Sequence, residues 1–354
     1  MRALSSATIN KLDKSGMLEL LLDFPLQFGI ARELASKTGI IFSKRDFSSI
    51  VFAGLGGSAI GADLVRSYLY FESNLPMQVV REYDLPAYVG SSTLVFISSY
   101  SGNTEETLSA YSQARKKGSS IIAVSSNGAL KENCLRDGVT FIEIPKGLPP
   151  RCSLGYLSII PLCLLAKLGL IKDASSSLDK TVSALEDLRS RKLNPAIGAK
   201  DNIAKYVAGR LVNKFPIIYS ASVHFDTVAT RMRCQLNENS KSLASSHVFP
   251  EMNHNEIVGW EHPARLFKNL AVVMLRDKGA HPRVNKRMDI TREIICKENP
   301  DIIEIYSEGE DLLARIFSLI YIGDFVSFYL AVLYGIDPTP VERVTYLKKK
   351  LAED

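Results

Sequence analysis

The stretch TLVFISSYSGNTEET, residues 93–107, is the most informative part of this 354-residue chain for the fold. Its first five residues, 93–97, are apolar or β-branched and lead into a turn rich in serine. An apolar run without alternation of polar and apolar positions is typical of a strand that is covered on both faces. The segment therefore predicts a strand, a turn and a following helix within a parallel sheet.

The same order recurs along the chain. Similar apolar runs predict strands at residues 50–53, 120–124, 140–144, 215–220, 270–275 and 301–305. Helical patterns are expected at residues 1–40, at the polar stretch 173–194 and at the apolar stretch 316–334. We expect an α/β fold of two doubly wound domains, each a parallel sheet flanked by helices. The expected limits are a helical segment at 1–40, a first domain at 41–172, a helical connector at 173–198 and a second domain at 199–354.

The composition is that of an ordinary globular protein, with 46% hydrophobic and 23% charged residues. Lys and Arg outnumber Asp and Glu by 43 to 38, and the longest basic run is residues 348–350. This mild, scattered excess does not indicate a nucleic-acid partner, and it fits a small anionic substrate equally well. The five cysteines form no CxxC pair and no signal peptide is present, so we expect reduced thiols in a cytoplasmic protein.

Two apolar stretches could suggest a membrane. Residues 157–170 are too few to span a bilayer. Residues 316–334 are long enough, but Asp324 lies at their centre, where a charge is costly in lipid. We expect a helix buried in the core or at a subunit interface, and no membrane partner.

The glycine-rich turn at residues 54–61, GLGGSAIG, follows the first predicted strand and opens a helix. Glycines allow backbone amides to approach an anion, and a helix N-terminus favours negative charge. A dinucleotide fingerprint is an alternative, although Glu72 precedes the next strand rather than ending it. A tight turn that binds no ligand is a second alternative.

The turn at residues 99–104 is more specific. It places three hydroxyls, Ser99, Ser101 and Thr104, around Gly102. Hydroxyls combined with helix N-terminal amides can hold a phosphomonoester without lysines. The alternative is a simple helix cap at Thr104, for which one hydroxyl would suffice.

These residues resemble a known family. The motif Ser-x-Ser-Gly-Asn-Thr-x-Glu-Thr is similar to the phosphate loop of SIS (sugar isomerase) domains. Further motifs resemble the bifunctional phosphoglucose/phosphomannose isomerases: LPPR at 148–151, NENSK at 237–241, PEMNHNEI at 250–257 and DPTPV at 337–341. The resemblance implies two SIS domains, no cofactor, and interconversion of glucose 6-phosphate and mannose 6-phosphate with fructose 6-phosphate through an enediolate.

The resemblance also implies roles for individual residues. The substrate would be held by Gly56, Gly57, Ser58, Ser99, Ser101 and Thr104, with Thr339 a further hydroxyl of the pocket. Glu238 would move a proton between C1 and C2, and Arg151 would hold that carboxylate and stabilise the enediolate. His254 would open the sugar ring, reaching in from the partner subunit of a homodimer with shared active sites, and Lys348 would assist.

Alternatives stay open at several of these positions. Glu238 could be a solvated helix residue and Arg151 a loop cap, since most glutamates and arginines are of this kind. A zinc site from His247, Glu251, His254 and Glu256 is a rival, although no HExxH motif supports it. Tyr100 and Trp260 are expected to be packing residues. An aminosugar-phosphate isomerase and a non-catalytic sugar-phosphate sensor are the alternative functions.

Overall fold

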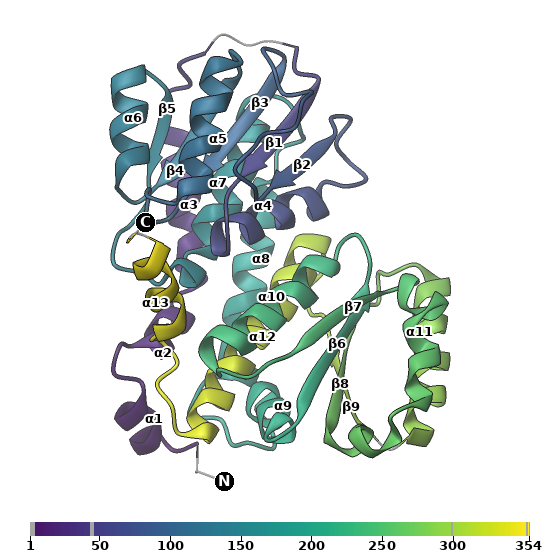
Figure 1. The fold of residues 1–354 in the computed structure, drawn as a ribbon. Coiled ribbons are helices and arrows are strands. Elements are labelled where there is room, and N and C mark those ends of the chain that lie inside the picture. Colours follow the sequence, from purple (N-terminus) through teal and green to yellow (C-terminus); the bar gives the residue numbers. More distant parts are fainter. Residues whose placement is uncertain (1–3, 43–45, 299, 352, 354) are drawn as a thin grey trace. The chain divides into compact units, whose positions relative to one another are not determined.

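The computed structural model describes residues 4–42, 46–298, 300–351 and 353, and the chain divides into two compact units. Asp23–Val182 form the 23–182 unit, and Met1–Leu22 with Ser183–Asp354 form the 183–354 unit. Each unit holds one parallel sheet flanked by helices (Figure 1), which confirms the expected α/β class. The expected domain limits stay a prediction, because compactness alone does not fix where a domain begins.

The sheet of the 23–182 unit has five parallel strands in the order β2-β1-β3-β4-β5. The strands are β1 (Ser49–Ala53), β2 (Met77–Val80), β3 (Thr93–Ser98), β4 (Ser120–Ser125) and β5 (Thr140–Glu143). All residues of β1, β3 and β4 are buried, as their uninterrupted apolar runs predict. The edge strand β2 was not predicted, because it is short and alternates between half-buried and exposed positions.

Helices cover both faces of this sheet (Figure 1). The helices of the unit are α3 (Leu26–Lys37), α4 (Gly57–Tyr68), α5 (Glu105–Lys116), α6 (Ala129–Asp137) and α7 (Leu154–Lys167), with a 3₁₀ turn η1 (Pro150–Cys152). On one face, Ala110 and Tyr111 of α5 and Leu130 of α6 pack against Val95 and Ile121 of the strands. The layer of α3, α4 and α7 lies on the other face. The polar stretch after α7 is helical as expected, with α8 (Ser175–Leu188) and a π-helical turn η2 (Arg189–Leu193).

The sheet of the 183–354 unit has four parallel strands in the order β7-β6-β8-β9. These are β6 (Phe215–Ala221), β7 (Ser245–Phe249), β8 (Leu270–Arg276) and β9 (Asp301–Tyr306). The edge strand β7 was also missed, because its first residues are Ser, Ser and His. The helix α11 (Pro282–Ile295) covers one face, while α9 (Ile203–Leu211), α10 (Asp226–Asn239) and α12 (Leu312–Tyr334) cover the other (Figure 1). The remaining elements are α1 (Ser6–Leu12), α2 (Met17–Leu22), α13 (Glu342–Leu351) and the 3₁₀ turns η3 (Glu251–His254), η4 (Glu256–Glu261), η5 (Ala264–Asn269) and η6 (Cys296–Glu298).

The apolar helix α12 is long enough to cross a membrane by length and composition, but its most apolar window is entirely buried within the structure. Its central Asp324 is paired with Arg231 of α10, and each of these side chains is 4% exposed. The Tyr321 hydroxyl donates to the carbonyl oxygen of Leu21, which attaches α2 to the same helix. The helix is therefore the core of the 183–354 unit, one of the two alternatives expected from the sequence.

Candidate functional site

The strand order of the 23–182 sheet reverses direction at the carboxyl ends of β1 and β3. From β1 the chain moves to β2 on one side and then returns to β3 on the other side. Loops that leave neighbouring strands in opposite directions open a binding crevice at that point. The two loops concerned are residues 54–56 and 99–104, which the sequence indicated as anion-binding turns.

The hydroxyls of the second loop lie close together. Thr104 is the N-cap residue of α5, but its side chain makes no capping hydrogen bond. Its Oγ1 instead lies 2.9 Å from Oγ of Ser99, which also accepts a hydrogen bond from the amide of Gly102 at 3.1 Å. Thr104 therefore stands at the N-cap position that the simple helix cap requires, but its hydroxyl contacts Ser99 and not an amide of the helix. The arrangement leaves the first-turn amides of α5 to a ligand, as an anion site requires.

The backbone of this loop is tightly packed. Gly102 has a φ of +73°, and a Cβ at this position would collide with the carbonyl oxygen of Asn127. Asn103 accepts a hydrogen bond from the amide of Ala129 at 2.9 Å, which joins the loop to the start of α6. Ser101 is exposed at the tip of the loop. Only a glycine fits at position 102, so the loop shape depends on that residue.

The first loop lies against the segment that carries Arg151. A Cβ on Gly57 would lie 2.8 Å from the carbonyl oxygen of Pro150 and 3.3 Å from Cα of Arg151. Ser58 is buried, and its hydroxyl accepts a hydrogen bond from the amide of Tyr100 at 3.3 Å. Arg151 itself is only 4% exposed. The structure thus brings the first loop, the hydroxyl loop and Arg151 together within one unit.

The Tyr100 hydroxyl links the hydroxyl loop to the chain that leads to Arg151. It donates to the carbonyl oxygen of Pro145 at 3.0 Å and accepts from the amide of Leu148 at 2.7 Å. Burial raises the pKa of Tyr100, so the phenol stays protonated and can donate. The sequence predicted only a packing role for this residue, because no pattern reveals a partner 45 residues away.

The dinucleotide alternative finds no support in the first loop. Gly56 has a φ of +54° at the N-cap of α4, which suits any tight strand-to-helix turn. Glu72 lies before β2, as the sequence indicated, whereas a dinucleotide site places an acid at the end of that strand. The residue that follows β2 is Arg81, which pairs with Asp63.

In the 183–354 unit, Glu238 lies in the last turn of α10 and is half-buried. It lines a hollow of about 560 Å³, the Glu238 hollow, together with Lys241, Asp337, Pro340 and Arg343. Thr339 belongs to the same segment as Asp337 and Pro340, and its amide donates to Oδ1 of Asp337 at 3.0 Å. Lys348 lies further along α13, exposed and outside the lining of this hollow.

His254 is exposed at the end of η3, on a loop that is fixed through Glu256. Glu256 accepts a hydrogen bond from the buried hydroxyl of Tyr219 at 2.6 Å, and its other oxygen lies 2.8 Å from Nδ1 of His247. Burial, and then the adjacent Glu256, raise the pKa of Tyr219. Trp260 is buried, as expected, and donates to Tyr219 at 3.1 Å. This network holds the loop in place around an accessible His254.

The residues considered for a zinc site do not converge. Within the described part of the chain, no three His, Cys, Asp or Glu side chains form a group that could hold a metal ion. His247 and Glu256 lie against each other, whereas Glu251 accepts a hydrogen bond from Asn255 at 3.1 Å.

Comparison with known proteins agrees with this geometry. Residues 200–351 match the model of the bacterial phospho-glucose isomerase C-terminal SIS domain. The chain is 47% identical over 337 residues to a bifunctional phosphoglucose/phosphomannose isomerase of Caldicellulosiruptor bescii, covering 95% of this chain and 99% of the relative. It is 38% identical over 306 residues to the enzyme of that name from Aquifex aeolicus, covering 86% and 91%.

The fold is also found among solved structures. The C-terminal domain of glucosamine-fructose-6-phosphate aminotransferase from Francisella tularensis superposes with a TM-score of 0.67 at 17% identity, covering 92% of this chain and 98% of that one. At that identity the likeness shows a shared fold and no more. The extent of identity to the curated relatives shows that the chain belongs to the bifunctional phosphoglucose/phosphomannose isomerase family.

Proposed function

We propose that this chain is an aldose–ketose isomerase that interconverts glucose 6-phosphate and mannose 6-phosphate with fructose 6-phosphate. The observation that carries the proposal is the cluster of hydroxyls at Ser99 and Thr104 beside the buried Arg151, in a chain of this family. The two hexose phosphates differ only in configuration at C2, and both give the same enediolate when the C2 proton is removed. One site can therefore serve both substrates.

The phosphate is held by Ser99, Ser101 and Thr104 with the N-terminal amides of α5. Gly57 and Ser58 of the first loop contact the sugar. The hydroxyls are neutral, so they can bind the phosphate dianion without competing for a nearby carboxylate base. Thr339 lines the sugar end of the site.

The proton transfers are assigned to charged groups. His254 opens the sugar ring by moving a proton from the C1 hydroxyl to the ring oxygen, and Lys348 assists. Glu238 removes the proton from C2, which converts the C1 carbonyl into an enediolate. A proton then passes from O2 to O1, and the same carboxyl group returns a proton to C1 as C2 becomes the carbonyl carbon. The Arg151 guanidinium stabilises the negative charge that develops on the enediolate oxygens. No step requires a metal or a cofactor.

The test follows solvent deuterium. The chain is incubated with fructose 6-phosphate in D₂O, and ¹H NMR measures the C2 proton of both aldose products. Proton transfer through an enediolate introduces deuterium at C2, whereas a hydride shift would introduce none. Glu238→Gln should lower turnover by about 10²–10⁴-fold. Glu293→Gln, an exposed glutamate on α11, is the matched control and should keep turnover within twofold. Binding of the hexose phosphates without any turnover would identify a sensor instead.

We further propose a homodimer in which each active site takes Glu238 from one subunit and His254 from the other. The exposed position of His254 suits a residue that completes a neighbour's site. If Glu238→Gln and His254→Ala chains exchange subunits, half of the dimers are mixed and each mixed dimer has one intact site. Activity should return to about a quarter of wild type by this symmetry argument. No return, with exchange verified by a tagged pull-down, would mean that both residues come from one chain.

We also assign the protein to the cytoplasm. All five cysteines are free thiols, and Cys296 is exposed to solvent. Thiols in this state fit a reducing compartment. Fractionation of cells followed by immunodetection tests this assignment, and recovery in an oxidising compartment would contradict it.

A further inference from the structure

Lys241 occupies an unusual backbone position. It follows α10 directly after the C-cap Ser240 and has a φ of +55°. Helices commonly end with a residue in this left-handed conformation, and glycine is favoured there because it has no Cβ. Lys241 therefore carries a long side chain at a position where the backbone conformation favours glycine.

The side chain of Lys241 connects two segments of the 183–354 unit. Its Nζ donates to the carbonyl oxygens of Glu238 at 2.8 Å and Asn239 at 3.2 Å, both in the last turn of α10. It also donates to the carbonyl oxygens of Asp337 at 3.2 Å and Pro338 at 3.0 Å. One ammonium group therefore joins the end of α10 to the segment after α12, and both segments line the Glu238 hollow.

The end of α10 is anchored on its other side by buried side chains. Asn239 donates to the hydroxyl of Ser327 on α12 at 2.9 Å, and the hydroxyl of Ser240 donates to the carbonyl oxygen of Ser327 at 2.8 Å. These contacts fix the helix end to the core. Lys241 adds the connection to the segment 337–338, and since it is itself exposed, changing it disturbs little packing.

We propose that Lys241 is a positioning residue for Glu238, which holds the last turn of α10 against residues 337–338. This inference rests on the proposed function, in which Glu238 is the base. It assigns Lys241 no contact with the substrate.

The experiment compares Lys241→Met with wild type in steady-state kinetics. The methionine keeps the length of the side chain and removes the ammonium. Turnover should fall by roughly 10- to 100-fold, because small displacements of a catalytic group have effects of this size. The KM should stay within about threefold, since the hydroxyl loop is unchanged, and this separation of kcat from KM is the signature of a positioning role.

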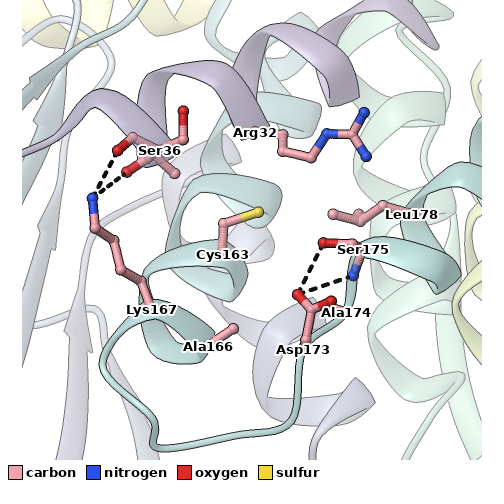
Figure 2. Close-up of a pocket in the computed structure, with 10 residues that line it drawn as sticks. Arg32, Ser36, Cys163, Ala166, Lys167, Asp173, Ala174, Ser175 and Leu178 are labelled. Atoms are coloured by element: carbon pink, nitrogen blue, oxygen red, sulfur yellow. Dashed lines mark hydrogen bonds between the residues drawn. The ribbon is translucent and has the colours of Figure 1, made fainter.

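The matched control is Lys167→Met (Figure 2). Lys167 donates its Nζ to the carbonyl oxygen of Ser36 at 2.8 Å, as Figure 2 shows. It also donates to the carbonyl oxygen of Thr38 at 2.7 Å, and both acceptors lie at the C-terminal end of α3. It lines a separate hollow of about 340 Å³ in the 23–182 unit, which contains none of the residues assigned to catalysis. The hydrogen-bonding chemistry is the same as at Lys241, yet turnover and KM should stay as in wild type.

Lys241→Gly distinguishes positioning from stability. Glycine relieves the left-handed backbone conformation, so thermal stability should be equal to or above that of Lys241→Met, while turnover should be equally low. A Lys241→Met chain with wild-type turnover would overturn the inference, and so would a Lys241→Gly chain with full turnover. Full turnover of Glu238→Gln would instead refute the assignment of the base, so the two failures are distinguishable.

Discussion

Replacing Asp324 with leucine removes one half of the buried ion pair that joins α12 to α10. In the folded chain Nη2 of Arg231 lies 2.9 Å from Oδ2 of Asp324, and Nε lies 3.2 Å from Oδ1. Each side chain is 4% exposed, so solvent screens the pair little. Without its partner the guanidinium of Arg231 stays buried and uncompensated. The expected loss in free energy of unfolding is about 3–5 kcal/mol for the 183–354 unit.

The assay is urea unfolding followed by tryptophan fluorescence. Trp260 is the chain's only tryptophan, and it is buried in the same unit, so its emission reports on that unit. With a urea dependence of about 1–3 kcal/mol per molar, Asp324→Leu should lower the midpoint by more than about 1 M. Arg231→Met should have a similar effect, because it leaves the carboxylate buried alone.

The double variant decides whether the ion pair is the cause. Arg231→Met combined with Asp324→Leu removes both charges and replaces them with apolar side chains. Such replacements are often neutral or stabilising, so most of the lost stability should return. Single variants that lose less than about 1 kcal/mol, as exposed pairs do, would refute the reasoning. A double variant that loses the sum of the two single effects would refute it as well.

Three further predictions concern the site and the thiols. Isomerase activity should survive EDTA, because carboxylate-catalysed proton transfer needs no Lewis acid, and loss of activity restored by zinc would contradict this. Ser101→Ala should raise KM roughly 10- to 100-fold with little change in kcat, because the substrate loses one hydrogen bond to its charged phosphate. Ser99→Ala should also lower thermal stability, because the hydroxyl loop loses the hydrogen bond to the amide of Gly102. Ellman's reagent at pH 8 should label Cys296 at once but Cys134 and Cys163 only after unfolding, because burial raises the thiol pKa to about 12 and about 11 and the reactive species is the thiolate.

The features that the sequence predicted best are those formed by residues close together in the chain. The interior strands were predicted because full burial demands apolar residues at every position, and β3 has all six residues buried. The hydroxyl loop was predicted because its hydroxyls and glycine lie within six residues of each other. The edge strands β2 and β7 were missed because one side of an edge strand meets solvent, and polar residues there resemble a loop.

The features that the sequence could not reveal depend on distant contacts. Asp324 was expected to be buried, but its partner Arg231 lies 93 residues earlier in the chain. Lys241 was noted only as part of a motif, since its carbonyl partners at 337 and 338 have no side-chain signature. Residues 4–22 pack with the 183–354 unit, for example through Leu21 and Tyr321, and no local pattern predicts that pairing.

The two sheets share one strand plan, yet the loops at their carboxyl ends carry side chains of different kinds. In the 23–182 unit the loops after β1 and β3 present hydroxyls and backbone amides. These groups can donate hydrogen bonds to a phosphate. In the 183–354 unit Asp277 follows β8, where its carboxylate is 2.8 Å from Nε of Arg315 and accepts from the hydroxyl of Ser307 at 2.5 Å.

This internal ion pair packs closely against the loop that follows β8. A Cβ on Gly279 would already lie 2.6 Å from Nη2 of Arg315, and Asp277 is only 4% exposed. A buried carboxylate also repels a phosphate dianion, and Arg315 is already neutralised by it. The two sheets therefore differ in the side chains that follow their strands and not in the strands themselves.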